Sequence, residues 1–431
     1  MNSMIQMELI YNRYMLKQNE IEKIVKIIEW FLTRLKTLDC CNLSQCEKIA
    51  YLGIIAESYP LIQPQKEFLE ICHILLKNLN EEIAIGQFKR LSMVNGLCNL
   101  ALFVEQLSIN SGYYKNFSSS LNMLIFRKTQ SHIENILKNE KDIIFYDYDV
   151  INGVSGIANF ILDHQDVEAQ KALRMIAKYL VRLTCNIKRK EKLYPGWYEK
   201  GLDPQTYPEG YFDYSISHGI AGPLYILIRL SKKHIIVQGQ IEAISKIINN
   251  YASVSIKNEN VICSGKISFS NWNNNFIQEP YKREGWCYGS VAVAKVLLEG
   301  TDFVNNIYIK NLAQQRILEV SSYEIEQLGL DIPILCHGYA GTAAIFRCLY
   351  DVYKNSKYLK QAQQLLLKVL SCFNSKSFFG FPCVEQTFFG GNIRQQNGDR
   401  LDVLEGSAGV IMEMLSWISK NTSFEKMLLL K

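Results

Sequence analysis

The segment His337-Gly338-Tyr339-Ala340-Gly341 is one copy of a motif that decides how this chain folds. In the motif, a turn residue and a glycine stand directly before small apolar residues. The leading glycines of the clear copies are Gly96, Gly153, Gly219, Gly289, Gly338 and Gly406, and a weaker copy surrounds Gly53. Successive copies lie 43 to 70 residues apart, which leaves room for two helices and their loops in each step.

Apolar residues at helical spacing fill the intervals between the copies. Beyond two early runs near residues 21–35 and 68–79, the helical stretches cover about 168–184, 221–231, 240–252, 309–328 and 358–373. Glycine permits a sharp turn into a helix, and a second small residue lets that helix pack closely on its neighbours. Each repeat is therefore predicted to be an outer helix, a loop and a small-residue inner helix.

About seven such pairs would close into a double-layered α/α toroid, an all-α fold. An open solenoid is the alternative, because repeats of this length also build helical arrays. We favour the ring because the polar residues that distinguish single copies make sense only if they converge. We expect residues 1–431 to form one toroid domain, in which no small insertion is located from the sequence.

The overall composition is that of a globular protein with a large core: 48% hydrophobic and 21% charged residues. The 47 basic and 42 acidic residues are interspersed, so no nucleic-acid partner is indicated. No apolar run approaches the roughly 20 residues of a membrane span. Residues 1–20 lack the apolar centre of a signal peptide, which predicts a cytoplasmic protein. The twelve cysteines are then thiols, most of them core filler.

Two connections are longer and richer in turn residues than the others. One runs from Lys188 to Ser217 and contains Asp203-Pro204; the other runs from Asn258 to Glu284 and contains the stretch 272–275. Long loops in a compact domain are usually functional lids or binding walls. Both directly precede a chemically distinctive copy of the motif, so we expect them to border the site.

Three potential metal ligands stand on two of the glycine turns. Cys287 lies in Trp-Cys-Tyr-Gly at 286–289, and Cys336 and His337 lie together 49 positions later. Two thiolates and an imidazole suit Zn²⁺, and a three-ligand set leaves a fourth position open for substrate. Two buried thiols and a capping histidine are the structural alternative.

Further polar residues are expected at the same rim. His218 stands directly before Gly219, and an imidazole can carry a proton at neutral pH. Asp149, four residues before Gly153, faces the same cavity in this arrangement or else caps a helix. Arg283 is a candidate to bind a carboxylate or an enolate oxygen, or is a surface cation.

Together these motifs resemble the lanthionine synthetase C-like family, whose best-known members are the lanthipeptide cyclases. The resemblance rests on His-Gly-x-x-Gly at 218–222, Trp-Cys-Tyr-Gly at 286–289 and Cys-His-Gly at 336–338, in that order. The segment 149–153 and Arg283 also match family positions. The resemblance spans most of the chain, and the three motifs together are highly specific.

The resemblance implies an α/α toroid with one Zn²⁺ held by Cys287, Cys336 and His337. It implies Michael-type addition of a peptide cysteine to dehydroalanine or dehydrobutyrine, which forms lanthionine or methyllanthionine. His218 and Asp149 match the family's acid/base residues, but the sequence leaves open which of them moves which proton.

Arg283 and Tyr288, the residue after Cys287, complete the predicted catalytic set. A chain of this length resembles a stand-alone cyclase, so a separate dehydratase would supply the dehydrated, leader-bearing precursor peptide. A transporter partner is expected too, with the protein cytoplasmic and peripheral to a membrane-associated biosynthetic complex.

Two other functions stay open at this point. A zinc thiol-alkylating toroid of the prenyltransferase type uses similar electrostatics, but it would need an Asp-Cys-His ligand set. A family relative that binds glutathione or a protein partner without cyclising peptides is the second, since fold and site do not dictate substrate.

Overall fold

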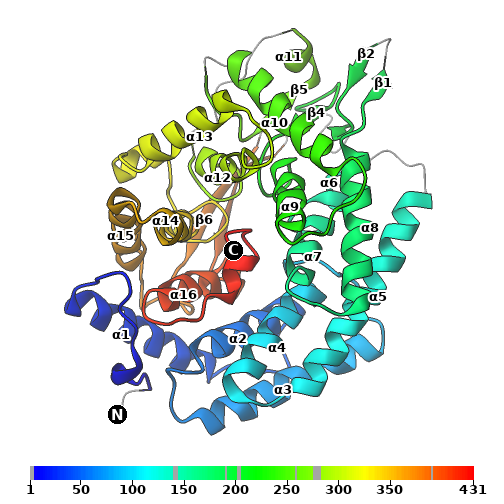
Figure 1. Cartoon of the computed structure of the whole chain (residues 1–431). Helices are drawn as coiled ribbons and strands as arrows, with labels where there is room; N and C mark the ends of the chain where they lie inside the picture. Colours follow the sequence, from blue (N-terminus) through cyan, green and yellow to red (C-terminus); the bar gives the residue numbers. More distant parts are fainter. Residues whose placement is uncertain are drawn as a thin grey trace.

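Two concentric layers of α-helices form a closed ring (Figure 1). The computed structural model describes residues 4–138, 144–189, 192–200, 205–257, 260–274, 283–389 and 392–431. In this part of the chain the outer layer consists of α1 (Gln18–Leu35), α3 (Gln65–Ala84), α5 (Lys115–Lys138), α8 (Val167–Leu183), α10 (Gln240–Lys257), α13 (Ile307–Val320) and α15 (Ser356–Ser371). The inner layer consists of α2 (Gln45–Ser58), α4 (Leu97–Ser111), α7 (Val154–Ile161), α9 (Ala221–Lys232), α12 (Ser290–Gly300), α14 (Tyr339–Tyr353) and α16 (Ser407–Ser416).

Helix α16 packs against α2, so the last pair meets the first and the predicted toroid is confirmed. The two layers differ in burial. An outer helix such as α1 buries one apolar stripe, whereas every residue of the inner helix α7 is buried. A fully buried Leu or Ile side chain contributes roughly 1.5–3 kcal/mol, so the stripes of the outer helices hold the two layers together.

The leading glycines stand at the starts of the inner helices. Gly96, Gly153, Gly289, Gly338 and Gly406 are the N-caps of α4, α7, α12, α14 and α16. Gly219 lies one residue before the N-cap of α9. The second glycines allow close approach: a Cβ at Gly341 or at Gly409 would collide with the carbonyl oxygen of Leu335 or Val403.

Two local predictions were wrong. Gly53 lies within α2, where it faces the side chains of Phe103 and Met412, and does not begin the helix. That helix begins instead behind a capping box, in which Ser44 and Glu47 satisfy the first backbone N–H groups. The predicted helix 309–328 ends at Val320 and is followed by the separate 3₁₀ helix η2 (Ile325–Leu328).

Backbone hydrogen bonds link each glycine turn to the next around one rim. In each bond the N–H of the first residue donates to the carbonyl of the second: Val94 to Ile151 (3.2 Å), Val150 to Ser217 (3.0 Å), Ser217 to Cys287 (3.5 Å), Cys287 to Cys336 (3.0 Å) and Cys336 to Leu404 (3.0 Å). A side-chain bond from Asn95 Nδ2 to Asp402 Oδ2 (2.9 Å) joins the last turn to the first. The turns therefore converge, as the ring prediction required.

The last residues of the sequence lie in the middle of the ring (Figure 1), in η3 (Ser423–Lys426) and the turn after it. Phe424 and Leu428 are fully buried. Inner elements donate to this segment from several sides: Asn159 Nδ2 to Lys426 O (2.6 Å) and Trp286 Nε1 to Leu428 O (2.8 Å). The chain itself thus occupies the centre of the toroid.

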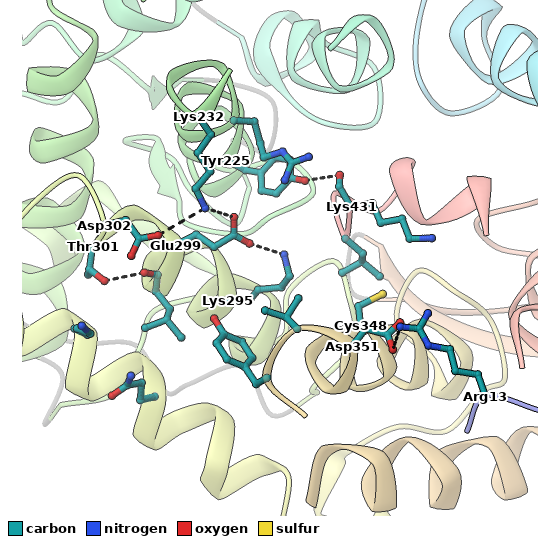
Figure 2. Close-up of a pocket in the computed structure, with 17 residues that line it drawn as sticks. Arg13, Tyr225, Lys232, Lys295, Glu299, Thr301, Asp302, Cys348, Asp351 and Lys431 are labelled. Carbon is teal, nitrogen blue, oxygen red and sulfur yellow. Dashed lines mark hydrogen bonds and ion pairs between the residues drawn. The ribbon is translucent and has the colours of Figure 1, made fainter. Parts of the chain in front are cut away.

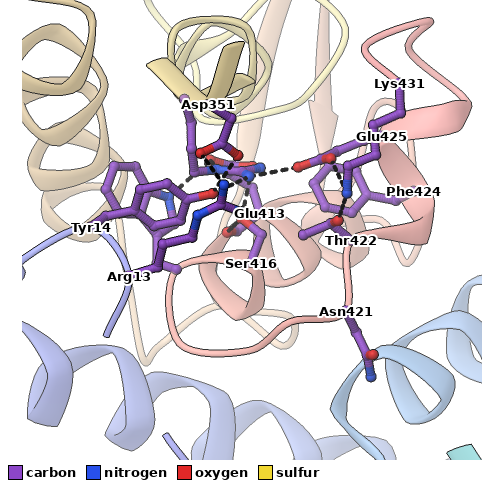
Figure 3. Close-up of polar contacts among 12 residues, drawn as sticks. Arg13, Tyr14, Asp351, Glu413, Ser416, Asn421, Thr422, Phe424, Glu425 and Lys431 are labelled. Atoms are coloured by element: carbon purple, nitrogen blue, oxygen red, sulfur yellow. Dashed lines mark hydrogen bonds and ion pairs between the residues drawn. The ribbon is translucent and has the colours of Figure 1, made fainter. Parts of the chain in front are cut away.

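A buried ion cluster anchors the same segment (Figure 3). Arg347 on α14 lies between Glu413 on α16 (2.7 Å) and Glu425 in η3 (2.6 Å), and all three side chains are almost completely buried. The Tyr14 hydroxyl accepts from Arg347 Nη1 (3.4 Å) and donates to Asp351 (2.9 Å), which connects the N-terminal segment to the cluster. Removing one member of such a cluster leaves uncompensated buried charge, so the cluster ties α14, α16 and η3 together.

Seven short strands occur in the described residues, all of them in antiparallel pairs. They are β1 (Ile187–Arg189) with β2 (Lys192–Tyr194), β3 (Tyr198–Glu199) with β4 (Tyr211–Asp213) and β5 (Lys266–Ser268), and β6 (Cys383–Phe389) with β7 (Asn392–Gly398). The two long connections carry β1 to β5, and the β3-β4-β5 sheet joins them. Asp203-Pro204 and Asn275, named in these connections, lie outside the described residues.

A pocket of about 780 Å³ lies at the opposite ends of the inner helices (Figure 2). The last turns of α9, α12 and α14 line it, and Lys232 and Lys295 both contact Glu299 there (3.2 and 2.7 Å). The glycine turns are at the other ends of these helices, so this pocket is separate from the predicted site. None of the described helices combines the length and the apolarity that a membrane span requires.

Candidate metal centre and acid–base pair

The three predicted metal ligands come together between two neighbouring glycine turns. The ligand atoms of Cys287, Cys336 and His337 all lie within 4.8 Å of one another. The Cys287 N–H donates to the Cys336 carbonyl (3.0 Å), so the backbone itself aligns the two turns. Gly285 completes this packing, because a Cβ there would lie 2.5 Å from the Cα of His337.

The donor set fits zinc. Tetrahedral Zn²⁺ with bonds of about 2.0–2.3 Å places its ligand atoms roughly 3.5 Å apart, which this cluster can accommodate. The hydrogen bond from Cys336 and the proximity of His337 lower the pKa of Cys287 to about 6, against the effect of burial. A thiol that ionises this readily is a good metal ligand. Both cysteines are nearly buried, whereas His337 is partly exposed.

His218 and Asp149 form the second part of the site. His218 Nδ1 lies 2.7 Å from Asp149 Oδ2, and the Asp149 side chain is completely buried. A carboxylate only accepts hydrogen bonds, so Nδ1 carries the proton and Nε2 is the nitrogen directed away from Asp149. The ring of Phe145 packs edge-on against the imidazole, with 4.8 Å between centroids.

Asp149 fulfils both of the roles considered for it. Its Oδ1 accepts the N–H groups of Asn152 (2.7 Å) and Gly153 (2.6 Å), which closes the turn before α7. Its Oδ2 contacts His218 at the same time. The cap and the contact with the rim histidine are therefore not alternatives.

The histidine turn and the metal turn are neighbours. Ser217 Oγ donates to the Cys287 carbonyl (3.2 Å), and the charge of His218 contributes to the lowered pKa of Cys287. Ser217, which was not predicted as a site residue from the sequence, joins the two turns. Its position before His218 in the motif was the available signal.

Tyr288 and Arg283 differ in their placement. The Tyr288 hydroxyl donates to Asp213 Oδ2 (3.2 Å), and burial together with the Asp213 carboxylate raises the pKa of the phenol well above its usual value. Arg283 forms an ion pair with the exposed Asp331 (3.1 Å) and is itself about one third exposed. Among the described contacts, none joins Arg283 to His218 or to the ligand group.

Most of the remaining cysteines belong to the core: four are buried and three, Cys40, Cys263 and Cys372, pack partly buried against it. Cys72, Cys98 and Cys348 are buried, and burial raises the pKa of each thiol, so they stay protonated. The prediction that most cysteines are core filler is confirmed, but it is wrong for Cys41 and Cys185, which are exposed. Asp213 is the other residue that sequence reasoning missed; it stands five residues before His218 in a stretch read as a loop.

The fold and the site define a class: a double-layered α/α toroid with a Cys/His group that could hold a metal ion at the rim where its inner helices begin. A family model for lanthionine synthetase C-like proteins matches residues 52–429. The chain therefore belongs to the lanthionine synthetase C-like family.

Two known proteins show how near the relationship is. The chain is 27% identical over 298 residues to the nisin biosynthesis protein NisC of Lactococcus lactis subsp. lactis, which covers 67% of this chain and 70% of that protein. The solved structure of a nisin cyclase superposes with a TM-score of 0.71 and 21% sequence identity. It covers 96% of this chain and 98% of the other, which supports the toroid fold.

Proposed function

We propose that this protein is a zinc-dependent lanthipeptide cyclase. The observation that carries the proposal is the convergence of Cys287, Cys336 and His337 within 4.8 Å, one hydrogen bond away from the turn of His218. Membership of the lanthionine synthetase C-like family and the similarity to NisC, a nisin biosynthesis protein, support a peptide substrate.

The proposed reaction is an addition without loss of atoms. The sulfur of a peptide cysteine bonds to the β-carbon of dehydroalanine or dehydrobutyrine, and the electron pair of the C=C bond moves to the α-carbon as an enolate. A proton on the α-carbon completes the lanthionine or methyllanthionine. The thiol proton lost and the α-proton gained balance each other, so the mass of the peptide does not change.

Cys287, Cys336 and His337 would hold one Zn²⁺ per chain. When bound, zinc lowers the pKa of a substrate thiol and keeps it as a nucleophilic thiolate at neutral pH. The contribution of the chain is to bring three ligands together and to leave one position open. The site contains two cysteines and a histidine, and therefore differs from the Asp-Cys-His ligand set of the prenyltransferase type.

His218 is the proposed proton carrier. Its Nδ1–H bond to Asp149 fixes the tautomer and the ring orientation, so Nε2 can take up the thiol proton or protonate the α-carbon. Asp149 stabilises the imidazolium and acts through His218. Arg283 is proposed to bind a carboxylate or the enolate oxygen, for which it must leave Asp331. Tyr288 is proposed to shape the site beside Cys287.

The wider context follows from the same chemistry. A dehydratase must supply the dehydrated, leader-bearing precursor, and a transporter is the proposed partner after cyclisation. We propose that residues 1–431 act as one toroid domain in the cytoplasm, peripheral to a membrane-associated complex.

The test is a thiol count on the cognate dehydrated, Cys-containing precursor peptide. The purified protein with zinc is incubated with the precursor, and the remaining free thiols are alkylated and counted by mass spectrometry. We expect thiols to disappear, and to persist with Cys336→Ala or without protein. Cys372→Ala, which removes a thiol at the end of α15, is the matched control and should stay active. Persistence of every thiol with the wild-type protein would rule out a cyclase.

A further inference from the structure

Two copies of the repeat carry an aspartate four residues before the leading glycine, and both aspartates close their own turn. Asp149 Oδ1 accepts the N–H groups of Asn152 and Gly153. Asp402 Oδ1 accepts those of Leu404 and Glu405, both at 2.8 Å. Used this way, a carboxylate acts as a helix or turn cap.

The second oxygen of each aspartate contacts the next glycine turn around the rim. Asp149 Oδ2 bonds to His218, which precedes Gly219 (2.7 Å). Asp402 Oδ2 accepts from Asn95, which precedes Gly96 (2.9 Å). One carboxylate thus closes its own turn and holds the side chain that stands before the glycine of the next glycine turn.

Asp213 repeats this arrangement in a third copy. Its Oδ1 accepts the N–H of Ser215 (2.8 Å), and its Oδ2 accepts from the Tyr288 hydroxyl (3.2 Å). Tyr288 precedes Gly289, so it holds the same place in its copy as His218 and Asn95 hold in theirs. Asp213 stands two residues earlier than its counterparts because Ser215 Oγ takes over the capping of Gly219.

The partners of the three aspartates differ in chemistry. Asn95 carries no titratable group, His218 is the proposed proton carrier, and Tyr288 directly follows the proposed ligand Cys287. We infer that Asp213 is a positioning residue for the reaction, which holds Tyr288 beside the metal turn as Asp149 holds His218. The inference rests on the proposed cyclase function, because it assigns a task within that reaction.

The hydrogen bond to Asp213 also determines the role of the Tyr288 phenol. Asp213 is 1% exposed and belongs to β4, and its Oδ1 lies so near Gly219 that a Cβ there would come within 2.5 Å. The carboxylate cannot turn away, and it can only accept, so it directs the phenol proton toward itself. Tyr288 is therefore a fixed wall of the site, and protonation of the α-carbon is left to His218.

Glu199 is a second buried carboxyl group beside Asp213. It lies on β3, next to β4, and is completely buried. Burial, followed by the negative charge of Asp213, raises the pKa of Glu199 to about 8.

The experiment compares Asp213→Asn with Asp402→Asn. Asp402 holds the equivalent place in another copy of the repeat, and its partner Asn95 carries no titratable group. In both variants the amide oxygen can still close the turn, so thermal stability should change little and by a similar amount. Only Asp213→Asn should lower kcat for thiol consumption of the dehydrated precursor, by roughly tenfold or more with little change in KM, as loss of a charged hydrogen bond would. Asp402→Asn should keep kcat within about twofold. Tyr288→Phe combined with Asp213→Asn should be no slower than Tyr288→Phe alone.

The outcomes separate the two proposals. If the wild-type protein consumes no thiol, the cyclase function fails and this inference fails with it. If the wild type is active and Asp213→Asn keeps the kcat of Asp402→Asn, only the inference is overturned. If Asp213→Asn does not fold at 25 °C, the kcat of Tyr288→Phe is the test instead. An unchanged kcat in that variant would show that the reaction needs no positioned phenol and would overturn the inference.

Discussion

The Asp149 carboxylate lies 2.7 Å from His218 Nδ1 while its other oxygen closes the turn at Gly153. The two residues are 69 positions apart and belong to adjacent copies of the repeat. Because the same carboxylate serves both contacts, the position of the imidazole is determined by the geometry of a turn. A rigid backbone thus orients the proposed proton carrier.

Asp149→Asn should slow cyclisation far more than it destabilises the protein. The amide can donate to Nδ1 and so favour the wrong tautomer of His218, and we expect kcat to fall roughly 100-fold. Stability should fall by less than about 1 kcal/mol, because the Asn carbonyl oxygen can still accept the N–H groups of Asn152 and Gly153. Thiol consumption under single-turnover conditions and urea unfolding measure the two effects. A variant with wild-type kcat would contradict the role given to the pair.

Cys336→Ala should lose the metal. Wild-type protein is expected to bind about one Zn²⁺, and the variant less than roughly one tenth of that, because two ligands do not hold zinc tightly. Elemental analysis after dialysis against a weak chelator gives the stoichiometry. Cys372→Ala serves as control and should retain its zinc. Equal zinc content in the two variants would mean that Cys336 is not a ligand.

Arg347→Met should destabilise the fold by about 3–5 kcal/mol. The substitution leaves Glu413 and Glu425 buried without their shared cation. Lys233→Met, which removes an exposed partner of Asp163, should cost at most about 1 kcal/mol. Urea unfolding of the two variants tests the difference. Similar stabilities would show that the buried cluster contributes no more than a surface pair.

Glu199 should make the protein less stable as the pH rises. Its pKa is raised from 4.5 to about 8 in the folded protein, so the folded state holds the proton between these values. The unfolding free energy therefore falls as pH increases from about 4.5 to 8. Glu199→Gln cannot ionise, and its stability relative to wild type should improve over this range by an amount on the order of 3 kcal/mol.

Urea unfolding of wild type and Glu199→Gln at pH 5 and pH 8.5 measures this effect. Glu57, whose pKa burial raises to about 7, titrates in the same range in both proteins, so the comparison cancels its contribution. A stability difference between the two proteins that does not change with pH would show that Glu199 is already ionised in the fold.

The sequence by itself determined the repeat, the toroid and the three residues of the ligand group. These follow from local rules, because a glycine before small apolar residues marks the start of an inner helix wherever it stands. Cys287 and Cys336-His337 occupy such turns, so their convergence was predictable once the ring was assumed. The same local rules failed at Gly53, where a capping box begins the helix instead.

Only the tertiary structure decided which residues are partners. Asp213 and Tyr288 are 75 positions apart, and the segment after Ser423 lies in the middle of the ring against helices distant in sequence. No local pattern encodes such pairs, because they exist only once the ring closes and brings neighbouring copies into register. The sheet of β3, β4 and β5 depends on the same closure, since its strands come from two separate connections.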